Sequence, residues 1–229
     1  NRMRSNTGDG ADVYTFAQDQ TRCLAAAGAL AEPTAEYAKA AQEDNDAGAV
    51  SAAAIGKTLY AYPLTSDNGY LMYYDKSVVT DPSDLDAILE DCEKAGKNFY
   101  MEINSGWYQT AFFFGTGCKL SYETDNAGNF TGADVDYASD QGVTALREMI
   151  RLKSSSSFVN GSAAGDAENI GAIVDGLWDE ETIQEKLGDN YACAKLPSFQ
   201  GTDGNTYQMS GFSGYRFLGV KPQEDEEKE

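Results

Sequence analysis

The chain has 229 residues, 17 of them basic and 37 acidic, which gives a formal net charge of −20. Such an acidic excess argues against nucleic-acid binding, which requires a basic face, and against docking on an anionic membrane surface. Apolar residues make up 41% of the chain, so a folded core is expected, and the length fits one large domain or two lobes.

No uninterrupted apolar run reaches about 18 residues, so we expect no membrane-spanning helix. Residues 1–9 are mostly polar, residues 223–229 are mostly charged, and no signal segment or initiating Met is present. We interpret both ends as cuts through a longer protein.

Histidine is absent, which excludes Ser-His-Asp and Cys-His catalytic arrangements. The four cysteines are far apart in the sequence, so a zinc site would require all of them to converge. We therefore expect neither a metal nor a cofactor. One or two disulfides in an exported protein and plain buried thiols both fit the cysteines, which are Cys23, Cys92, Cys118 and Cys193.

In chain order, the first third predicts alternating strands and helices. These are a strand at 11–16, a helix at 21–32, one or two Ala-rich helices within 33–54, and strands at 58–63 and 69–74. The clearest helix follows at 83–95, where Ser83 can cap the start and Gly96 can close the end. Its expected buried stripe has helical spacing and consists of Leu85, Ile88, Leu89 and Cys92.

The remainder continues the alternation. We expect a strand at 99–103, a helix at 107–116, a hairpin turn at 126–129, a helix at 141–153, a strand at 170–174, a helix at 179–187, and strands at 191–196 and within 207–220. The expected buried side of the helix at 141–153 consists of Val143, Leu146, Met149 and Ile150. The pattern is typical of an α/β protein with a largely parallel sheet.

Aromatic residues lie beside turns and carboxylates at three places, where open α/β sheets commonly bind ligands. Phe16 lies three residues before Asp19, Trp107 and Tyr108 follow a Gly-containing turn, and Trp178 precedes Asp179. Aromatic rings stack on the apolar face of a sugar, and carboxylates such as Asp19 and Asp67 accept pairs of hydroxyl hydrogen bonds. Either Trp can instead belong to the core, Phe16 alone favours the core, and Asp67 can serve only a turn.

Taken in order, several segments resemble the family 1 extracellular solute-binding proteins, most closely the maltose/maltodextrin-binding branch. The segments that carry the resemblance are Thr7-Gly8-Asp9-Gly10-Ala11-Asp12, Phe16-Ala17-Gln18-Asp19, Gly28-Ala29-Leu30-Ala31-Glu32, Gly56-Lys57-Thr58-Leu59-Tyr60-Ala61-Tyr62-Pro63-Leu64, Tyr73-Tyr74-Asp75-Lys76, Trp107-Tyr108, Asp175-Gly176-Leu177-Trp178 and Ala194-Lys195-Leu196-Pro197-Ser198-Phe199.

The resemblance implies an α/β, two-lobe periplasmic-binding-protein-like (type II) fold with a hinge. Residues 1–65 and 210–229 would form an incomplete N-terminal lobe, and residues 66–209 the C-terminal lobe. It also implies a monomer that captures malto-oligosaccharides for an ABC transporter permease. The protein would be extracellular, either as a cell-surface lipoprotein or in the periplasm, and the 229-residue chain alone is expected to bind sugar weakly or not at all.

By the same resemblance, Phe16 and Asp19 contact the ligand from the first lobe, and Asp67 contacts it from just past the first crossover between the lobes. Trp107 or Tyr108 provides one stacking ring of the second lobe, and Trp178 provides the other. Two positions depart from the family pattern. Gln20 stands where a basic residue commonly follows the carboxylate, and Asp67 is shorter than the usual Glu.

Three alternatives remain at this point. The ligand can be another oligosaccharide. The chain can be a glycoside-active enzyme with paired carboxylates such as Asp134 and Asp136, although that stretch reads as solvent-exposed. Finally, residues 125–129 superficially suggest a calcium loop, but the EF-hand spacing and its terminal Glu are missing, and a turn fits better.

Overall fold

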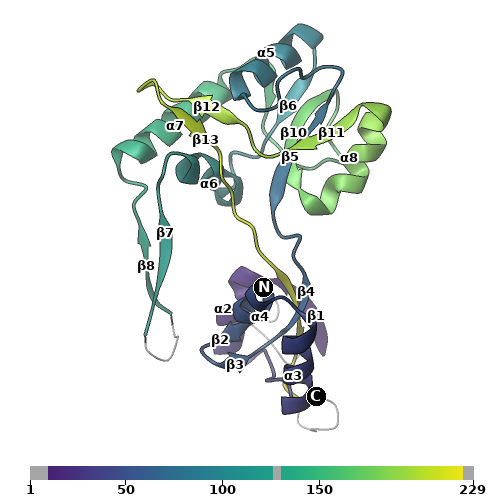
Figure 1. The fold of residues 1–229 in the computed structure, drawn as a ribbon, viewed down its shortest axis with the longest axis vertical. Helices are drawn as coiled ribbons and strands as arrows, with labels where there is room; N and C mark the ends of the chain where they lie inside the picture. Colours follow the sequence, from purple (N-terminus) through teal and green to yellow (C-terminus); the bar gives the residue numbers. More distant parts are fainter. Residues whose placement is uncertain (1–9, 126–129, 224–229) are drawn as a thin grey trace. The chain divides into compact units, whose positions relative to one another are not determined.

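A computed structural model describes residues 10–125 and 130–223 of the chain. The expected hairpin turn at 126–129 lies outside the described residues. The chain divides into two compact units. Unit 1 comprises residues 1–68, 122–132 and 213–229, and unit 2 comprises residues 69–121 and 133–212. Each unit is described separately (Figure 1).

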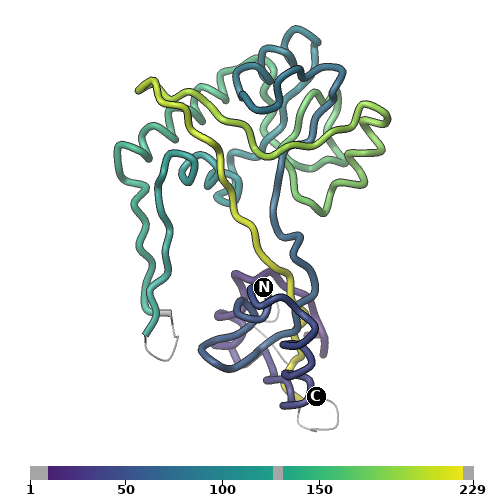
Figure 2. Tube along the Cα trace, viewed as in Figure 1, coloured from purple at the N-terminus to yellow at the C-terminus, as the bar shows by residue number. Residues whose placement is uncertain are grey.

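Unit 1 is built on a three-stranded antiparallel sheet with the order β1-β14-β4. Its strands are β1 (Val13–Ala17), β4 (Tyr62–Thr65) and β14 (Arg216–Val220), and its helical elements are the 3-10 turn η1 (Gln18–Gln20), α2 (Thr21–Ala26), α3 (Ala35–Asp44) and α4 (Ala47–Ala52). A small ladder joins β2 (Ala54–Ile55) to β3 (Thr58–Leu59). The colours in Figure 2 show that β14, from the far end of the chain, lies beside β1.

The helix expected at 21–32 is shorter than predicted. It ends at Ala26 because Gly28 adopts a left-handed conformation, with φ of 66°. The amide of Ala29 then donates back to the carbonyl of Leu24 at 2.9 Å, which closes the helix end.

Unit 2 contains a five-stranded sheet with the order β11-β5-β10-β6-β9. Its strands are β5 (Tyr70–Asp75), β6 (Asn98–Tyr100), β9 (Phe158–Val159), β10 (Ile170–Gly176) and β11 (Tyr191–Ala194). Only β5 is antiparallel to its neighbours, so the other four strands run in one direction. The prediction of a largely parallel sheet is therefore confirmed for this unit, with β5 as the exception.

Helices cover both faces of the unit 2 sheet (Figure 1). They are α5 (Leu85–Ala95), α6 (Gly106–Gly115), α7 (Asp140–Lys153) and α8 (Glu180–Leu187), accompanied by the 3-10 turns η2 (Leu177–Asp179) and η3 (Gly188–Asn190). Alternate residues of β5 enter two cores: Met72 packs with residues of α5, α6 and α7, whereas Tyr73 packs with Ile183 of α8. A ladder of β12 (Ser198–Gln200) with β13 (Thr206–Gln208) completes the unit.

One further hairpin, β7 (Leu120–Thr124) with β8 (Phe130–Val135), crosses the boundary between the two units in sequence. Among its described residues, Tyr122 and Val135 have exposed side chains.

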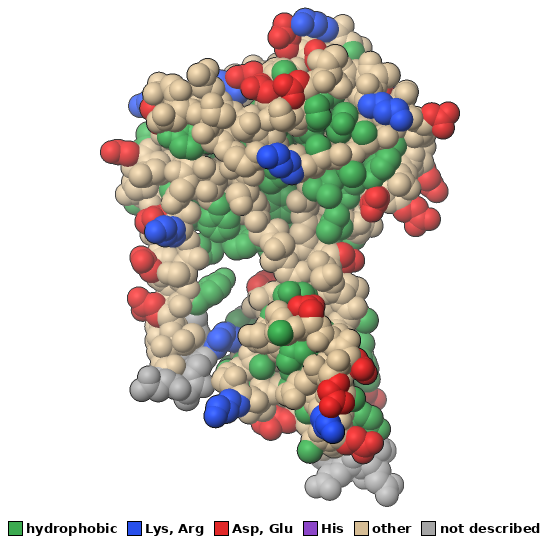
Figure 3. Space-filling view, in the orientation of Figure 1, with side chains coloured by type: hydrophobic (Ala, Val, Ile, Leu, Met, Phe, Trp, Pro, Cys, Tyr) green, Lys and Arg blue, Asp and Glu red, His purple; other side chains and the backbone are tan. Residues whose placement is uncertain are grey.

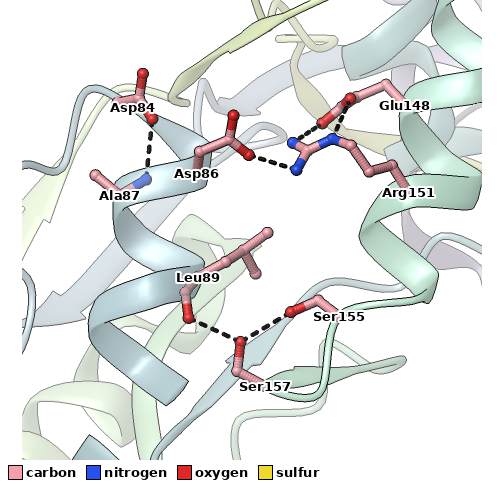
Figure 4. Close-up of polar contacts among 8 residues, drawn as sticks. All are labelled: Asp84, Asp86, Ala87, Leu89, Glu148, Arg151, Ser155 and Ser157. Carbon is pink, nitrogen blue, oxygen red and sulfur yellow. Dashed lines mark hydrogen bonds and ion pairs between the residues drawn. The ribbon is translucent and has the colours of Figure 1, made fainter. Parts of the chain in front are cut away.

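Helix α5 confirms the predicted stripe, since Leu85, Ile88, Leu89 and Cys92 are all buried. Gly96 closes the helix in a left-handed conformation, as expected. The start differs by one residue: the side chain of Asp84, not that of Ser83, accepts from the amide of Ala87 at 2.9 Å (Figure 4).

The predicted buried side of α7 is wrong at three of its four positions. Val143, Leu146 and Ile150 are exposed, whereas Met149 is buried as expected, together with Gly142, Ala145, Glu148 and Leu152. Small residues permit a close approach here, because a Cβ on Gly142 would lie 1.8 Å from the carbonyl oxygen of Tyr137.

The carboxylate of Glu148 tolerates burial because Arg151 binds it with two nitrogens, at 2.8 and 2.5 Å (Figure 4). Arg151 also pairs with Asp86 of α5, which links the two helices. The buried face of α7 therefore includes Glu148, a charged residue that the pattern of apolar residues had not placed there, and its ion pair with Arg151 makes this burial possible.

Candidate functional site

The candidate site residues of unit 2 lie at one edge of its sheet. Because β5 is reversed, its first residue, Tyr70, is paired with Gly176, the last residue of β10. The parallel strand β6 ends at the same edge and leads into α6, which begins at Gly106. Trp178 follows β10 and Trp107 opens α6, so the sheet places both tryptophans beyond the same strand ends.

Trp178 is 42% exposed, and its ring lies directly against the backbone of Gly176. A Cβ at position 176 would lie 2.1–2.4 Å from three ring atoms of the indole. Glycine is therefore required for this placement of the ring, although its backbone, with φ of −68°, suits any residue. The turn is also fixed by hydrogen bonds from the Tyr73 hydroxyl to the Gly176 carbonyl at 3.3 Å and from the Leu177 amide to the Gly69 carbonyl at 3.1 Å.

Trp107 and Tyr108, alternatives for one stacking ring, differ in their surroundings. Trp107 is half-buried, stacks on Phe212 with ring centroids 5.0 Å apart, and meets the edge of Tyr70. Tyr108 is only 5% exposed and belongs to the hydrophobic core, so it offers no ring face to a ligand here. Burial therefore favours Trp107 as the stacking residue.

Sequence reasoning missed Asp175, the last residue but one of β10. It is 1% exposed, and its Oδ1 accepts from the Gly176 amide at 2.7 Å and from the Tyr108 hydroxyl at 3.4 Å. Burial raises the pKa of Asp175 to about 7, and the negative charge of Asp179 adds to the shift. A single carboxylate inside the otherwise apolar run 170–176 was the signal that could have identified it.

The candidate residues of unit 1 also share one sheet edge. Ala17 of β1 and Thr65 of β4 both lie opposite Arg216, the first residue of the central strand β14. Asp19 and Asp67 each follow two residues later, so the register places them beyond the same edge with one strand between them. Two strand spacings amount to about 10 Å, a distance that a sugar unit with its hydroxyls can bridge.

The local environments of these residues differ. Phe16 is half-buried between Tyr14 and Phe217, with ring centroids 5.9 and 5.8 Å away, as its apolar character favours. Asp19 is exposed and accepts from the side-chain amide of Gln20 at 2.6 Å. The neutral Gln20 therefore orients this carboxylate, where the family pattern has a cation.

Asp67 is half-buried and accepts from the hydroxyl of Thr65. This bond ties the carboxylate to the turn after β4, the local role already considered for it. Arg216, at the start of β14 between the two carboxylate-bearing turns, was not predicted as a site residue. In the sequence, Arg216 is recognisable as the one basic residue at the start of an otherwise apolar strand.

The carboxylates considered for catalysis lie at solvent-exposed positions, as the sequence indicated. Asp134 and Asp136 are both exposed, and Asp136 accepts from the backbone amide of Lys119 at 2.6 Å. No group of three or more His, Cys, Asp or Glu side chains that could hold a metal ion occurs among the described residues. Most of the calcium-loop alternative, residues 126–129, lies outside them. All four cysteines are free, with Cys92 and Cys118 buried and Cys23 and Cys193 exposed.

The surface is consistent with the acidic composition. Asp and Glu side chains are spread over the face shown in Figure 3 rather than gathered in one patch. In the part of the chain that the structure describes, no helix is long and apolar enough to cross a membrane.

Comparisons with known proteins place this arrangement in a family. The model of the family described as "Bacterial extracellular solute-binding protein" matches residues 2–229. A solved structure described as being with acarbose is 28% identical and has a TM-score of 0.83, with 99% of this chain and 59% of that chain covered. The maltodextrin-binding protein MalE1 from L. casei BL23, solved without ligand, is 25% identical with a TM-score of 0.72, with 96% and 59% covered.

The chain thus spans about three fifths of the length of these solved structures, 59% in both cases. It shares with them the α/β fold of the two-lobe binding proteins. The chain belongs to the bacterial extracellular solute-binding proteins, and the solved structures that it is similar to include one with acarbose and one of a maltodextrin-binding protein.

Proposed function

We propose that the protein containing this chain captures malto-oligosaccharides outside the cytoplasm and delivers them to an ABC transporter permease. The observation that carries the proposal is the exposed ring of Trp178, held flat on Gly176 at the sheet edge where Trp107 also lies. A rigid aromatic surface at strand ends suits the apolar face of a glucose ring. The neighbouring structures support the choice of ligand, since one is with acarbose and another is a maltodextrin-binding protein.

In this proposal the chain contributes to two lobes of a hinged clamp. Residues 1–65 and 210–229 would belong to the first lobe and residues 66–209 to the second. Phe16 and Asp19 would meet the ligand from the first lobe, and Asp67 from just past the first crossover between the lobes, with the carboxylates accepting from sugar hydroxyls. Trp107 and Trp178 would stack on it from the second. A ligand that bridges both lobes selects the closed state, and the permease would recognise that state.

The same proposal covers location and assembly. The protein would act as a monomer, in the periplasm or as a lipoprotein on the cell surface, and it would perform no chemistry on the sugar. Incubation with maltohexaose followed by chromatography tests the last point, and the expected result is that the sugar is recovered intact. Shorter products that disappear in the Asp134→Asn variant would support a glycoside-active enzyme instead.

Calorimetric titration of the full-length protein with maltotriose tests the binding itself. Trp178→Ala is expected to lower the affinity by roughly 10- to 150-fold, because one stacked aromatic contributes about 1.5–3 kcal/mol. Tyr37→Ala is the matched control, since Tyr37 is an exposed aromatic of α3 outside the candidate site. Tight binding of a β-linked glucan, galactoside or xyloside in place of maltotriose would keep the clamp but change the sugar.

A further inference from the structure

A buried carboxylate connects the two elements that carry the tryptophans of unit 2. Asp175 lies three residues before Trp178, and its hydrogen-bond donor Tyr108 directly follows Trp107. The same oxygen, Oδ1, also accepts from the amide of Gly176, the residue on which the Trp178 ring lies. One carboxylate oxygen thus binds both the residue next to Trp107 and the residue on which the Trp178 ring lies.

We infer that Asp175 is a positioning residue: through Tyr108 and Gly176 it holds Trp107 and Trp178 in one fixed arrangement for stacking on a ligand. This inference rests on the proposed function for its consequence in sugar binding, whereas the positioning itself is a property of unit 2 alone.

The connection has the features of a functional site rather than of simple packing. Asp175 is 1% exposed within a strand whose residues are all buried, and its second oxygen, Oδ2, has no hydrogen-bond partner among the described residues. A buried oxygen without a partner destabilises the fold. An apolar residue or a neutral amide at this position would destabilise the fold less, so packing alone does not explain why a carboxylate is present.

The charges around Asp175 are unfavourable to its ionised form. Asp179 from η2 raises its pKa, and Glu102 acts on Tyr108 in the same sense. On the β5 side, Tyr73, whose hydroxyl binds the Gly176 carbonyl, interacts electrostatically with Asp175. Opposing these, the Gly176 amide and the Tyr108 hydroxyl favour the carboxylate.

The hold on the tryptophans therefore depends on pH. Hydrogen bonds to an ionised carboxylate are about twice as strong as neutral ones, so the Gly176 and Tyr108 contacts weaken when Asp175 takes up a proton. The ionised form of Asp175 holds the two rings more firmly, so a ligand that needs both rings in place should bind that form better. By linkage, binding is then expected to release a proton near neutral pH.

The first experiment needs no ligand. Full-length protein labelled with 5-fluorotryptophan is titrated from about pH 5.5 to about 8.5 and followed by ¹⁹F NMR. The Trp178 signal is assigned by its loss in Trp178→Phe. We expect that signal to shift with a midpoint near 7, no such shift in Asp175→Asn, and a higher midpoint in Tyr108→Phe. Tyr207→Phe, which removes the hydroxyl bound to Asp203 in the same unit, is expected to behave as the wild type.

A Trp178 signal that does not respond to pH, or that responds equally in Asp175→Asn, would overturn the inference. Because Asn is close to Asp in size and keeps an accepting oxygen, this variant tests the charge without removing the contact.

The second experiment uses calorimetry with maltotriose near pH 7 in two buffers of different ionisation enthalpy. Wild type is expected to release a fraction of a proton on binding and Asp175→Asn none, while Tyr108→Phe weakens binding about fivefold to tenfold. Proton uptake, or equal release in both proteins, would contradict the inference. If wild type binds no α-glucan, the proposed function fails, and the NMR titration still decides whether Asp175 positions Trp178.

Discussion

Replacing Gly176 with Ala should damage the ligand surface while leaving the fold intact. The backbone at this position has φ of −68° and ψ of 155°, which Ala adopts without strain. The added methyl group would lie 2.1, 2.2 and 2.4 Å from three atoms of the Trp178 ring. Carbon atoms in contact are normally about 3.5–4.0 Å apart, so the indole must move by more than 1 Å or rotate away.

The expected magnitudes follow from that geometry. Because Trp178 is already 42% exposed, its displacement should cost the fold little, and the Gly-to-Ala change itself favours folding by about 0.4–1 kcal/mol. The free energy of unfolding should therefore change by less than about 1 kcal/mol. Sugar affinity should instead fall by up to roughly 150-fold, the loss expected for removal of the ring.

A double-mutant cycle separates this mechanism from general damage. Maltotriose affinity is measured by calorimetry for wild type, Gly176→Ala, Trp178→Ala and the double variant, with stability followed by denaturant unfolding. Since the methyl group acts only through the indole, Gly176→Ala should have almost no further effect once Trp178 is gone. Undiminished affinity in Gly176→Ala, or a full additional loss in the Trp178→Ala background, would refute the reasoning.

Three further predictions concern stability and reactivity. Burial raises the pKa of Asp175 from 3.8 to about 7, so between these pH values the folded protein keeps a proton that the unfolded chain loses. The free energy of unfolding should therefore fall as the pH rises through this range. Measured by urea unfolding, Asp175→Asn should be more stable than the wild type by up to about 4 kcal/mol at pH 8 but little different at pH 4. Glu148→Ala should destabilise by about 1–3 kcal/mol by the same assay, because Arg151 loses its buried partner but keeps Asp86; an effect below that range would mean the network is not structural. In the native protein a thiol reagent should rapidly modify the exposed Cys23 and Cys193. The buried Cys92 and Cys118 should react only when the protein unfolds.

Sequence periodicity predicted α5 well because all four residues of its stripe are apolar and nothing polar competes for the interior. On α7 it was right only for Met149, because the buried face also includes Gly142, Ala145 and Glu148. Small residues and an ion-paired carboxylate carry no hydrophobic signal, and the pairing partners Arg151 and Asp86 come from different helices. Such a network is visible only once the tertiary structure is known.

The candidate site, too, could be predicted from the sequence only in part. The strand ends near Trp107 and Trp178 could be located from the sequence, because strands alternate with turns there. The sequence could not show which of Trp107 and Tyr108 faces outward. Neighbouring helix residues point in directions about 100° apart, and the predicted start of the helix was uncertain by a residue. Asp175 was missed because a strand pattern says nothing of a carboxylate bonded to a helix far away in the sequence.

The central place of β14 in unit 1 determines when that unit can fold. Both β1 and β4 pair only with β14 among the described strands, and β14 is separated from β1 by about 200 residues of sequence. During synthesis β1 and β4 therefore remain without their ladder until the chain has been made as far as Val220. The unit 2 sheet, whose strands all lie between Tyr70 and Ala194, can assemble earlier. The sheet of unit 1 is thus completed after that of unit 2, although β1 and β4 precede the unit 2 strands in the chain, and substitutions in β14 should slow the closure of unit 1 without delaying unit 2.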